Sequence, residues 1–134
     1  MKKVYLCGPI ASRKQEDAVE WRDEAKKKLH HWFDCLDPMR RPCWDGHDAI
    51  MFDKEDIRNA DILLVNYNCA RQYTTLCGTA MEVFYANSLD KFIVAFSDLE
   101  DEQRSPWMKY HCTTIQDSLD EAIKYIRQNF REDD

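Results

Sequence analysis

The chain has 134 residues, of which 44% are hydrophobic; this suits one globular domain over residues 1–134 and is too high for a disordered chain. Its formal net charge of −6 disfavours a general nucleic-acid-binding protein, because such a protein neutralises phosphates with a basic face. No stretch is long and apolar enough to span a bilayer and no signal peptide follows Met1, so we expect a cytoplasmic protein with no membrane partner.

Strand-like and helix-like segments alternate along the chain. Short apolar runs predict strands and the 3.6-residue spacing of apolar side chains predicts helices. Such alternation is typical of a parallel sheet with right-handed crossovers, so we expect an α/β three-layer sandwich, Rossmann-like or flavodoxin-like, with about five strands. In chain order, we expect strand 4–7, helix 14–32, strand 33–37, loop 39–47, helix 48–59, strand 61–66, helix 79–89, strand 91–96, loop 98–104, strand 113–115 and helix 119–130, the last capped by Ser118.

Metal and cofactor motifs are missing from the sequence. The six cysteines form no C-x-x-C pair, and the four histidines form no H-E-x-x-H motif. The three glycines do not form a dinucleotide or triphosphate cradle. We therefore expect no metal and no cofactor, and we expect reduced thiols.

Glu82 is the strongest candidate for a catalytic residue. It lies near the predicted start of a helix at about 79, shortly after the strand 61–66. Ligands of open α/β sheets bind at the carboxyl ends of the strands, where a carboxylate can attack a sugar carbon or stabilise positive charge on it. The alternative is structural, because Thr79-x-x-Glu82 also fits a capping box at a helix start.

Asp53, Ile57 and Asp61 share one face at i, i+4 and i+8, with Asp61 at the start of a strand. Asp53 could point over the edge of the sheet, or it could be an ordinary surface aspartate. Asp56 lies off this face, and we expect it to be solvated. Tyr5 lies in the first strand, where core packing is the default interpretation.

Several loop residues could contact a small ligand. The turn at Gly8-Pro9 follows the first strand and brings backbone close to that edge, although it also fits a plain turn. Trp44 and Trp107 fall in expected loops and could stack on a flat base, although packing is the default. His47 and His111 also fall in expected loops, where solvation is the more frequent case.

Four segments, taken in order and spacing, carry a resemblance over most of the chain. They are Tyr5-Leu6-Cys7-Gly8-Pro9-Ile10 with Trp21-Arg22 on the following helix, Asp53-x-x-x-Ile57-x-x-x-Asp61, Gly78-Thr79-Ala80-Met81-Glu82 and Ser105-Pro106-Trp107. Together they resemble the nucleoside 2-deoxyribosyltransferase family and its nucleoside 5′-monophosphate N-glycosidase relatives.

The resemblance implies roles for individual residues. Glu82 would be the nucleophile that forms a glycosyl-enzyme intermediate, Tyr5 would orient it, and Asp53 would protonate the departing base. A neighbouring subunit would complete the pocket, with the region 105–111 as a candidate, so we expect a homodimer or a larger homo-oligomer. The substrate, a small nucleoside or nucleotide and no nucleic-acid polymer, would be contacted by Gly8, Pro9, Ile10, Ser12, Arg13, Trp44, Gly78, Thr79, Trp107 and His111.

Two positions depart from the family pattern and leave the substrate open. Leu76 stands where the transferases commonly carry an aspartate, and Pro9 stands where the monophosphate glycosidases carry a serine. Three hypotheses follow. The first is 2-deoxyribosyl transfer between bases, the second is hydrolysis of nucleoside 5′-monophosphates, and the third is a nucleotide-binding module without turnover.

Overall fold

The computed structural model describes residues 1–10, 15–42, 46–68 and 77–132. Strands and helices alternate along these ranges, as the sequence predicts. The strands are β1 (Lys2–Cys7), β2 (Phe33–Leu36), β3 (Ile62–Asn66), β4 (Phe92–Phe96) and β5 (Thr114–Gln116). The helices are α1 (Gln15–Leu29), α2 (Gly46–Asn59), α3 (Cys77–Ser88), α4 (Pro106–His111) and α5 (Leu119–Phe130), with 3₁₀ turns η1 (Pro38–Arg40) and η3 (Asp101–Gln103).

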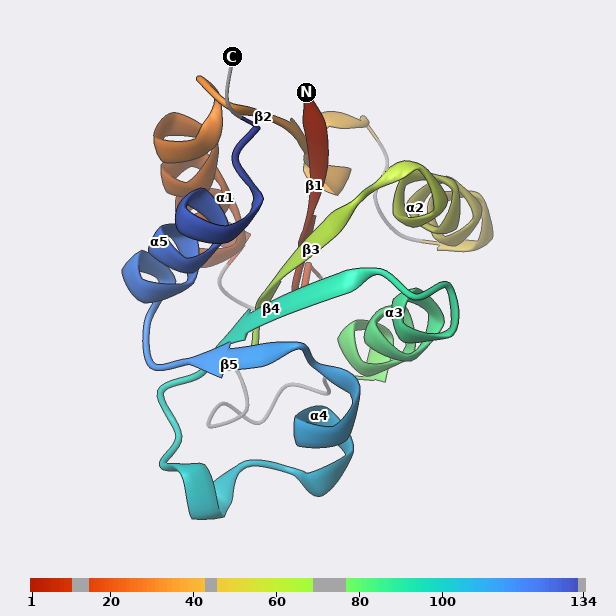
Figure 1. The fold of residues 1–134 in the computed structure, drawn as a ribbon. Helices are drawn as coiled ribbons and strands as arrows, with labels where there is room; N and C mark the ends of the chain where they lie inside the picture. Colours follow the sequence, from red (N-terminus) through yellow and green to blue (C-terminus); the bar gives the residue numbers. More distant parts are fainter. Residues whose placement is uncertain (11–14, 43–45, 69–76, 133–134) are drawn as a thin grey trace.

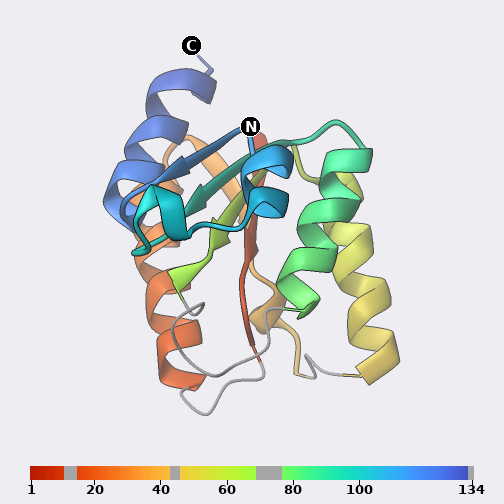
Figure 2. The same ribbon diagram turned by 90° about the horizontal axis from the view of Figure 1, so that it is seen from below.

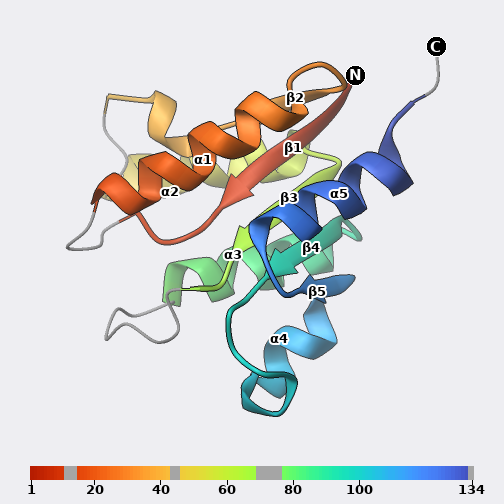
Figure 3. The ribbon, with the colours of Figure 1, turned by 90° about the vertical axis from the view of Figure 1, so that its left-hand side faces the viewer.

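The five strands form one parallel sheet in the order β2-β1-β3-β4-β5. Helices α1 and α5 cover one face, and α2 and α3 cover the other (Figure 1). Figure 3 shows α1 and α5 side by side on the near face. The predicted three-layer α/β sandwich is confirmed. In this strand order the topology switches between β1 and β3, and the carboxyl ends of these strands are where such sheets bind ligands.

Alternation along β1 divides its side chains between two cores. Val4 and Leu6 pack in the core beneath α1 and α5. Tyr5 and Cys7 pack in the core shared with α2 and α3, and all four side chains are fully buried. Successive side chains of a strand point to opposite faces, so Tyr5 and Cys7 necessarily share one face.

The irregular segments differ most from the prediction. The expected loop 39–47 contains η1, whose cap Asp37 accepts from the Met39 amide at 2.8 Å, and the start of α2 at Gly46. His47 therefore lies in the first turn of a helix. Residues 106–111 form α4, because Ser105 accepts a hydrogen bond from the Trp107 amide and a proline follows at the first helical position.

Smaller features follow the sequence closely. Ser118 caps α5 by accepting from the Glu121 amide at 3.2 Å. Asp61 holds the start of β3 against β1 through the Lys3 amide at 2.9 Å, as expected of a structural residue. Within the described ranges, no helix has the length and apolar character needed to cross a membrane.

Candidate active site

Glu82 points from α3 toward the end of β1. The Tyr5 hydroxyl donates to its Oε2 at 2.8 Å, and the Cys7 thiol donates to its Oε1 at 3.4 Å. Both donors come from one face of β1, two residues apart. Figure 2 shows the first turns of α3 beside the carboxyl end of that strand. Each carboxylate oxygen therefore has its own donor, and the group is held at the ligand-binding edge of the sheet.

The capping-box interpretation of Glu82 is wrong. Helix α3 begins at Cys77, so Thr79 is already its third residue and is buried rather than standing at the cap position. The carboxylate oxygens accept from side chains of β1. A helix that starts two residues earlier than predicted moves Glu82 into the second turn, away from the unpaired amides at the start.

The surroundings of Glu82 raise its pKa, so that the carboxyl group is only partly ionised near neutral pH. Burial and, to a smaller extent, the negative charge of Asp53 raise the pKa of Glu82 from 4.5 to about 7, although hydrogen bonds from Tyr5 and Cys7 and the charge of Arg22 oppose the rise. Burial also raises the pKa of the Tyr5 phenol and the Cys7 thiol well above their ordinary values. Both groups therefore stay protonated and act as donors.

Asp53 is a partly buried carboxylate on α2, not an ordinary surface aspartate. Its Oδ1 lies 3.1 Å from Nη1 of Arg41, and its side chain is 15% exposed. Burial raises the pKa of Asp53 to about 6, although the charge of Arg41 opposes the rise. Because its charge also raises the pKa of Glu82, the two carboxyl groups titrate as neighbours.

The prediction that Asp56 is solvated is wrong, since Asp56 is only 6% exposed. Arg40 binds it through two nitrogens at 2.9 and 3.0 Å, and Nη2 of Arg41 lies 2.5 Å from its Oδ2. Asp56 follows Asp53 by about one helical turn, so both lie on the side of α2 that faces Arg40 and Arg41. The helical pattern did not reveal this partner segment.

Arg22 fixes the end of β1 from the opposite layer. It is fully buried and donates to the carbonyls of Leu6, Gly8 and Ala18 at 3.3, 3.0 and 2.9 Å. A Cβ on Gly8 would lie 3.0 Å from Cζ2 of Trp21, so glycine permits this close packing. Pro9 and Ile10 follow with intermediate exposure.

The remaining predicted ligand contacts fall into two groups. Gly78 and Thr79 lie in the first turn of α3, where Gly78 is exposed and a Cβ added to it would have no atom of the described residues within 4 Å. Trp107 and His111 are helical residues of α4, not loop residues, and the His111 ring lies 5.5 Å from that of Phe84. Phe84 and Glu82 point to roughly opposite sides of α3. Within one chain, Trp107 and His111 thus lie on the side of α3 that faces away from Glu82. Ser12, Arg13 and Trp44 are outside the described residues.

Sequence reasoning missed three residues that contact the site. Cys7 shares the strand parity of Tyr5, and this pattern could have identified it. Arg22 belongs to the Trp21-Arg22 part of the family resemblance, which gave it no role, and Arg41 gave no signal, because the contacts of both residues depend on tertiary packing. No group of three or more His, Cys, Asp or Glu side chains in the described part of the chain could hold a metal ion.

The arrangement joins two carboxyl groups with different surroundings at one edge of the sheet. Glu82 is oriented by two neutral donors, and Asp53 is paired with a guanidinium. The two groups can share one proton, and the form with Glu82 ionised and Asp53 protonated can act as a nucleophile and a proton donor that cleave a glycosidic bond.

Comparisons with known proteins point to one family. Residues 4–121 match the family model described as nucleoside 2-deoxyribosyltransferase. No curated protein matches the sequence. The structure is similar to a 2-desoxiribosyltransferase from Leishmania mexicana, with a TM-score of 0.75, 19% identity and coverage of 97% of this chain and 99% of that one.

Two further solved structures share the fold. The 2-deoxyribosyltransferase of Bacillus psychrosaccharolyticus gives a TM-score of 0.71 at 20% identity, with 92% of this chain and 91% of that chain covered. A CMP N-glycosidase of Clostridium botulinum gives a TM-score of 0.64 at 14% identity, with 95% and 99% covered. By name, these neighbours are two deoxyribosyltransferases and a CMP N-glycosidase, and at such identities they show the fold that this chain adopts.

Proposed function

The chain belongs to the nucleoside 2-deoxyribosyltransferase family, and from this premise we propose that it cleaves the N-glycosidic bond of 2′-deoxynucleosides and transfers the deoxyribosyl group to another base. The observation that carries the proposal is the orientation of Glu82 by Tyr5 and Cys7 at the carboxyl edge of the sheet. An anion held there suits attack on a sugar carbon that develops positive charge.

The proposed reaction has two displacements. A Glu82 oxygen bonds to C1′ while the C1′–N bond breaks, and the base leaves with the electron pair and takes a proton from Asp53. A nitrogen of the second base then bonds to C1′ while the C1′–O bond to Glu82 breaks, and Asp53 recovers a proton from the incoming base. Two inversions retain the β-configuration at C1′.

A base-exchange assay tests the proposal. The enzyme is incubated with one deoxynucleoside and a different free base, and the products are separated by chromatography. We expect the exchanged nucleoside to form, and we expect Glu82→Ala to abolish the exchange while the circular dichroism spectrum stays unchanged. A wild-type enzyme that yields neither exchanged nucleoside nor free base would defeat the proposal, as would near-normal turnover by Glu82→Ala.

The alternative substrate is a nucleoside 5′-monophosphate, with water as the acceptor. The structural likeness to a CMP N-glycosidase favours testing it. Comparing kcat/KM for each deoxynucleoside with and without its 5′-phosphate separates the two activities. If Arg13 binds the phosphate, Arg13→Ala should reduce turnover of the monophosphate far more than turnover of the nucleoside. Tight binding without any turnover would instead favour a nucleotide-binding module.

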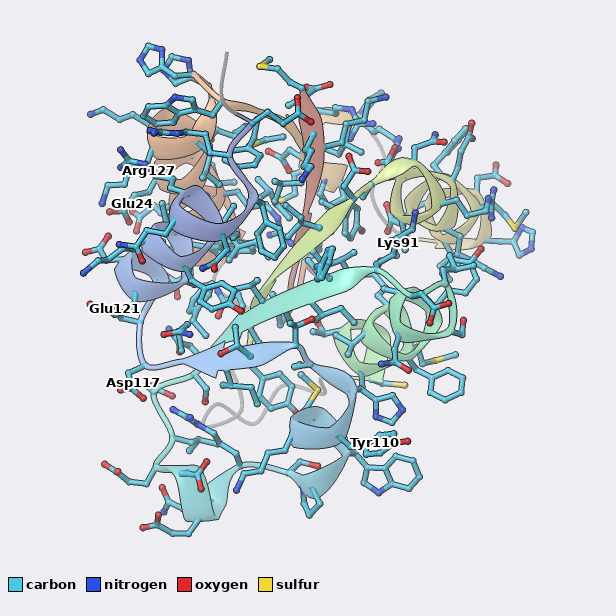
Figure 4. All side chains as sticks on the ribbon, in the orientation of Figure 1. Glu24, Lys91, Tyr110, Asp117, Glu121 and Arg127 are labelled. Carbon is cyan, nitrogen blue, oxygen red and sulfur yellow. The ribbon has the colours of Figure 1, made fainter. Side chains whose placement is uncertain are left out.

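We further propose that a second copy of the chain covers an apolar surface on α3 and α4. This α3–α4 patch consists of Met81, Phe84, Trp107 and Tyr110, which are 60% to 81% exposed. Figure 4 shows Tyr110 projecting from α4. Large exposed aromatic side chains are typical of protein interfaces, and a two-fold axis would place the same patch on both partners.

Sedimentation velocity tests this assembly. We expect the wild-type protein to sediment as a dimer or larger species, and Tyr110→Lys to shift it toward the monomer. Ile50→Lys, which places the same charge on an exposed residue of α2, is the matched control. A wild-type monomer at micromolar concentration would contradict the proposed assembly.

A further inference from the structure

Four charged side chains form a continuous cluster beside Glu82. Arg41 contacts two of the carboxylates of α2, with Nη1 at 3.1 Å from Asp53 and Nη2 at 2.5 Å from Asp56. Arg40 contacts Asp56 at 2.9 Å. Asp56 is the more buried carboxylate, and Asp53 is the one adjacent to the candidate nucleophile. The cluster thus links the active-site aspartate to a carboxylate that plays no part in the reaction proposed above.

We propose that Asp56 is a positioning residue which, by sharing Arg41, keeps Asp53 able to hold the proton that the leaving base requires. This inference rests on the function proposed above. Arg41 favours the ionised form of Asp53, because an opposite charge at ion-pair distance stabilises a carboxylate. Asp56 also binds this guanidinium, so Arg41 stabilises the ionised form of Asp53 less, and Asp56 adds a negative charge nearby. Both effects favour protonated Asp53.

The charged groups that surround Asp53 come from four elements. Arg41 directly follows η1, and Asp56 lies near the end of α2. Arg22 lies on α1 and Glu82 lies on α3. The Tyr5 phenol on β1 also faces this charge. Of these groups, Arg41 and Asp56 contact each other directly. A substitution of either one therefore changes how the other acts on Asp53.

The opposing effects of Arg41 and Asp56 on Asp53 also favour cleavage of the C1′–N bond. When the C1′–N bond breaks, its electron pair goes to the base nitrogen, which bonds the proton released by Asp53. The new Asp53 carboxylate then lies 3.1 Å from the Arg41 guanidinium that stabilises it. Asp56 therefore limits ionisation before the step, while Arg41 stabilises the carboxylate that the step creates.

Opposite charge changes in the cluster should have opposite effects. Asp56→Asn removes the competing carboxylate, so Arg41 binds Asp53 alone and Asp53 loses its proton at lower pH. Arg41→Gln removes the cation, so Asp53 keeps its proton to higher pH. We expect shifts of about one pH unit in each direction, typical of losing a close charge partner. Glu55→Gln is the matched control, because it removes one negative charge from an exposed residue next to Asp56.

Two measurements test whether Asp56 controls the protonation of Asp53. The first follows the Asp53 carboxyl by ¹³C NMR against pH in the substrate-free enzyme, assigned with Asp53→Asn. The second compares kcat/KM for 2′-deoxyguanosine and for its N7-methylated form, whose base leaves neutral without a proton. For Asp56→Asn we expect about a tenfold loss on the unmethylated substrate at neutral pH, because each pH unit removes tenfold of the protonated form. The methylated substrate should change by less than about threefold.

The outcomes separate this inference from the proposed function. Titration shifts in the same direction for Asp56→Asn and Arg41→Gln, shifts no larger than those of Glu55→Gln, or equal losses on both substrates would overturn the inference. A wild-type enzyme that cleaves neither substrate would count against the proposed function instead. The NMR titration would then still decide the relation between Asp56, Arg41 and Asp53. If Asp56→Asn does not fold, the titration of Arg41→Gln alone can contradict the expected direction.

Discussion

Tyr5 and Glu82 lie 77 residues apart in the sequence and meet in one hydrogen bond of 2.8 Å. Tyr5→Phe fills the same space and removes only the donor. Because this hydrogen bond lowers the pKa of Glu82, its loss should raise that pKa and leave less ionised nucleophile near pH 7. We expect kcat/KM to fall by about tenfold or more, and the acid limb of its pH profile to move to higher pH. A lower rate with an unmoved acid limb would contradict this role of Tyr5.

Glu82 should make the folded protein less stable as the pH rises. Its pKa is raised from 4.5 to about 7 in the folded state, so the folded protein binds the extra proton between these values. Stability is then greatest below pH 4.5 for this group and is lost as the pH rises through 7. Glu82→Gln should therefore exceed the wild type by roughly 2–3 kcal/mol at pH 8, with little difference near pH 4.5. Urea unfolding at both pH values measures the difference, and equal differences would refute the linkage.

Arg22 should be essential for stability although it lies outside the reacting groups. Arg22→Met leaves the buried carbonyls of Leu6 and Gly8 without their donor, and Asp37 loses a cation 3.9 Å away. We expect a loss of about 3–5 kcal/mol in the free energy of unfolding. Lys27→Met is the control on the exposed face of the same helix and should change stability by less than about 0.5 kcal/mol. Similar losses in both variants would show that the arginine contacts are not the cause.

Gly8 and Gly78 should respond in opposite directions to the same substitution. In Gly8→Ala the new Cβ would lie 3.0 Å from Trp21 and 3.2 Å from Asn66, so overpacking should cost about 1–3 kcal/mol. In Gly78→Ala no atom of the described residues lies within 4 Å of the new Cβ, and alanine favours a helix by about 0.4–1 kcal/mol over glycine. Thermal unfolding of both variants checks the contrast. A Gly8→Ala variant as stable as the wild type would mean that Trp21 yields without cost.

The layer architecture could be predicted because it depends on local periodicity. The alternation of β1 and the helical spacing of Ala18, Trp21 and Ala25 are visible in the sequence, and both describe buried faces in the structure. Helix α4 escaped prediction because six residues are too few to show a periodic pattern. Its cap at Ser105 and the following proline were the only local signals.

The site was predictable to a different degree in each of its parts. The family resemblance predicted roles for Glu82, Tyr5 and Asp53 that stay predictions, and the predicted helix start lies two residues after that of α3. The burial of Asp56 could not be predicted, because a helical pattern shows which residues share a face and not which loop covers it. Arg40, the last residue of η1, and Arg41, which follows it, contact Asp56 of α2 through tertiary packing that no local pattern reveals.

The alternating side chains of β1 serve both the hydrophobic core and the candidate active site. Inserting or deleting one residue in this strand would exchange its faces, sending the phenol and the thiol into the layer of α1 and α5 and turning valine or leucine toward Glu82. Directed evolution of this protein should therefore accept changes of side chain in β1 but no change of its length.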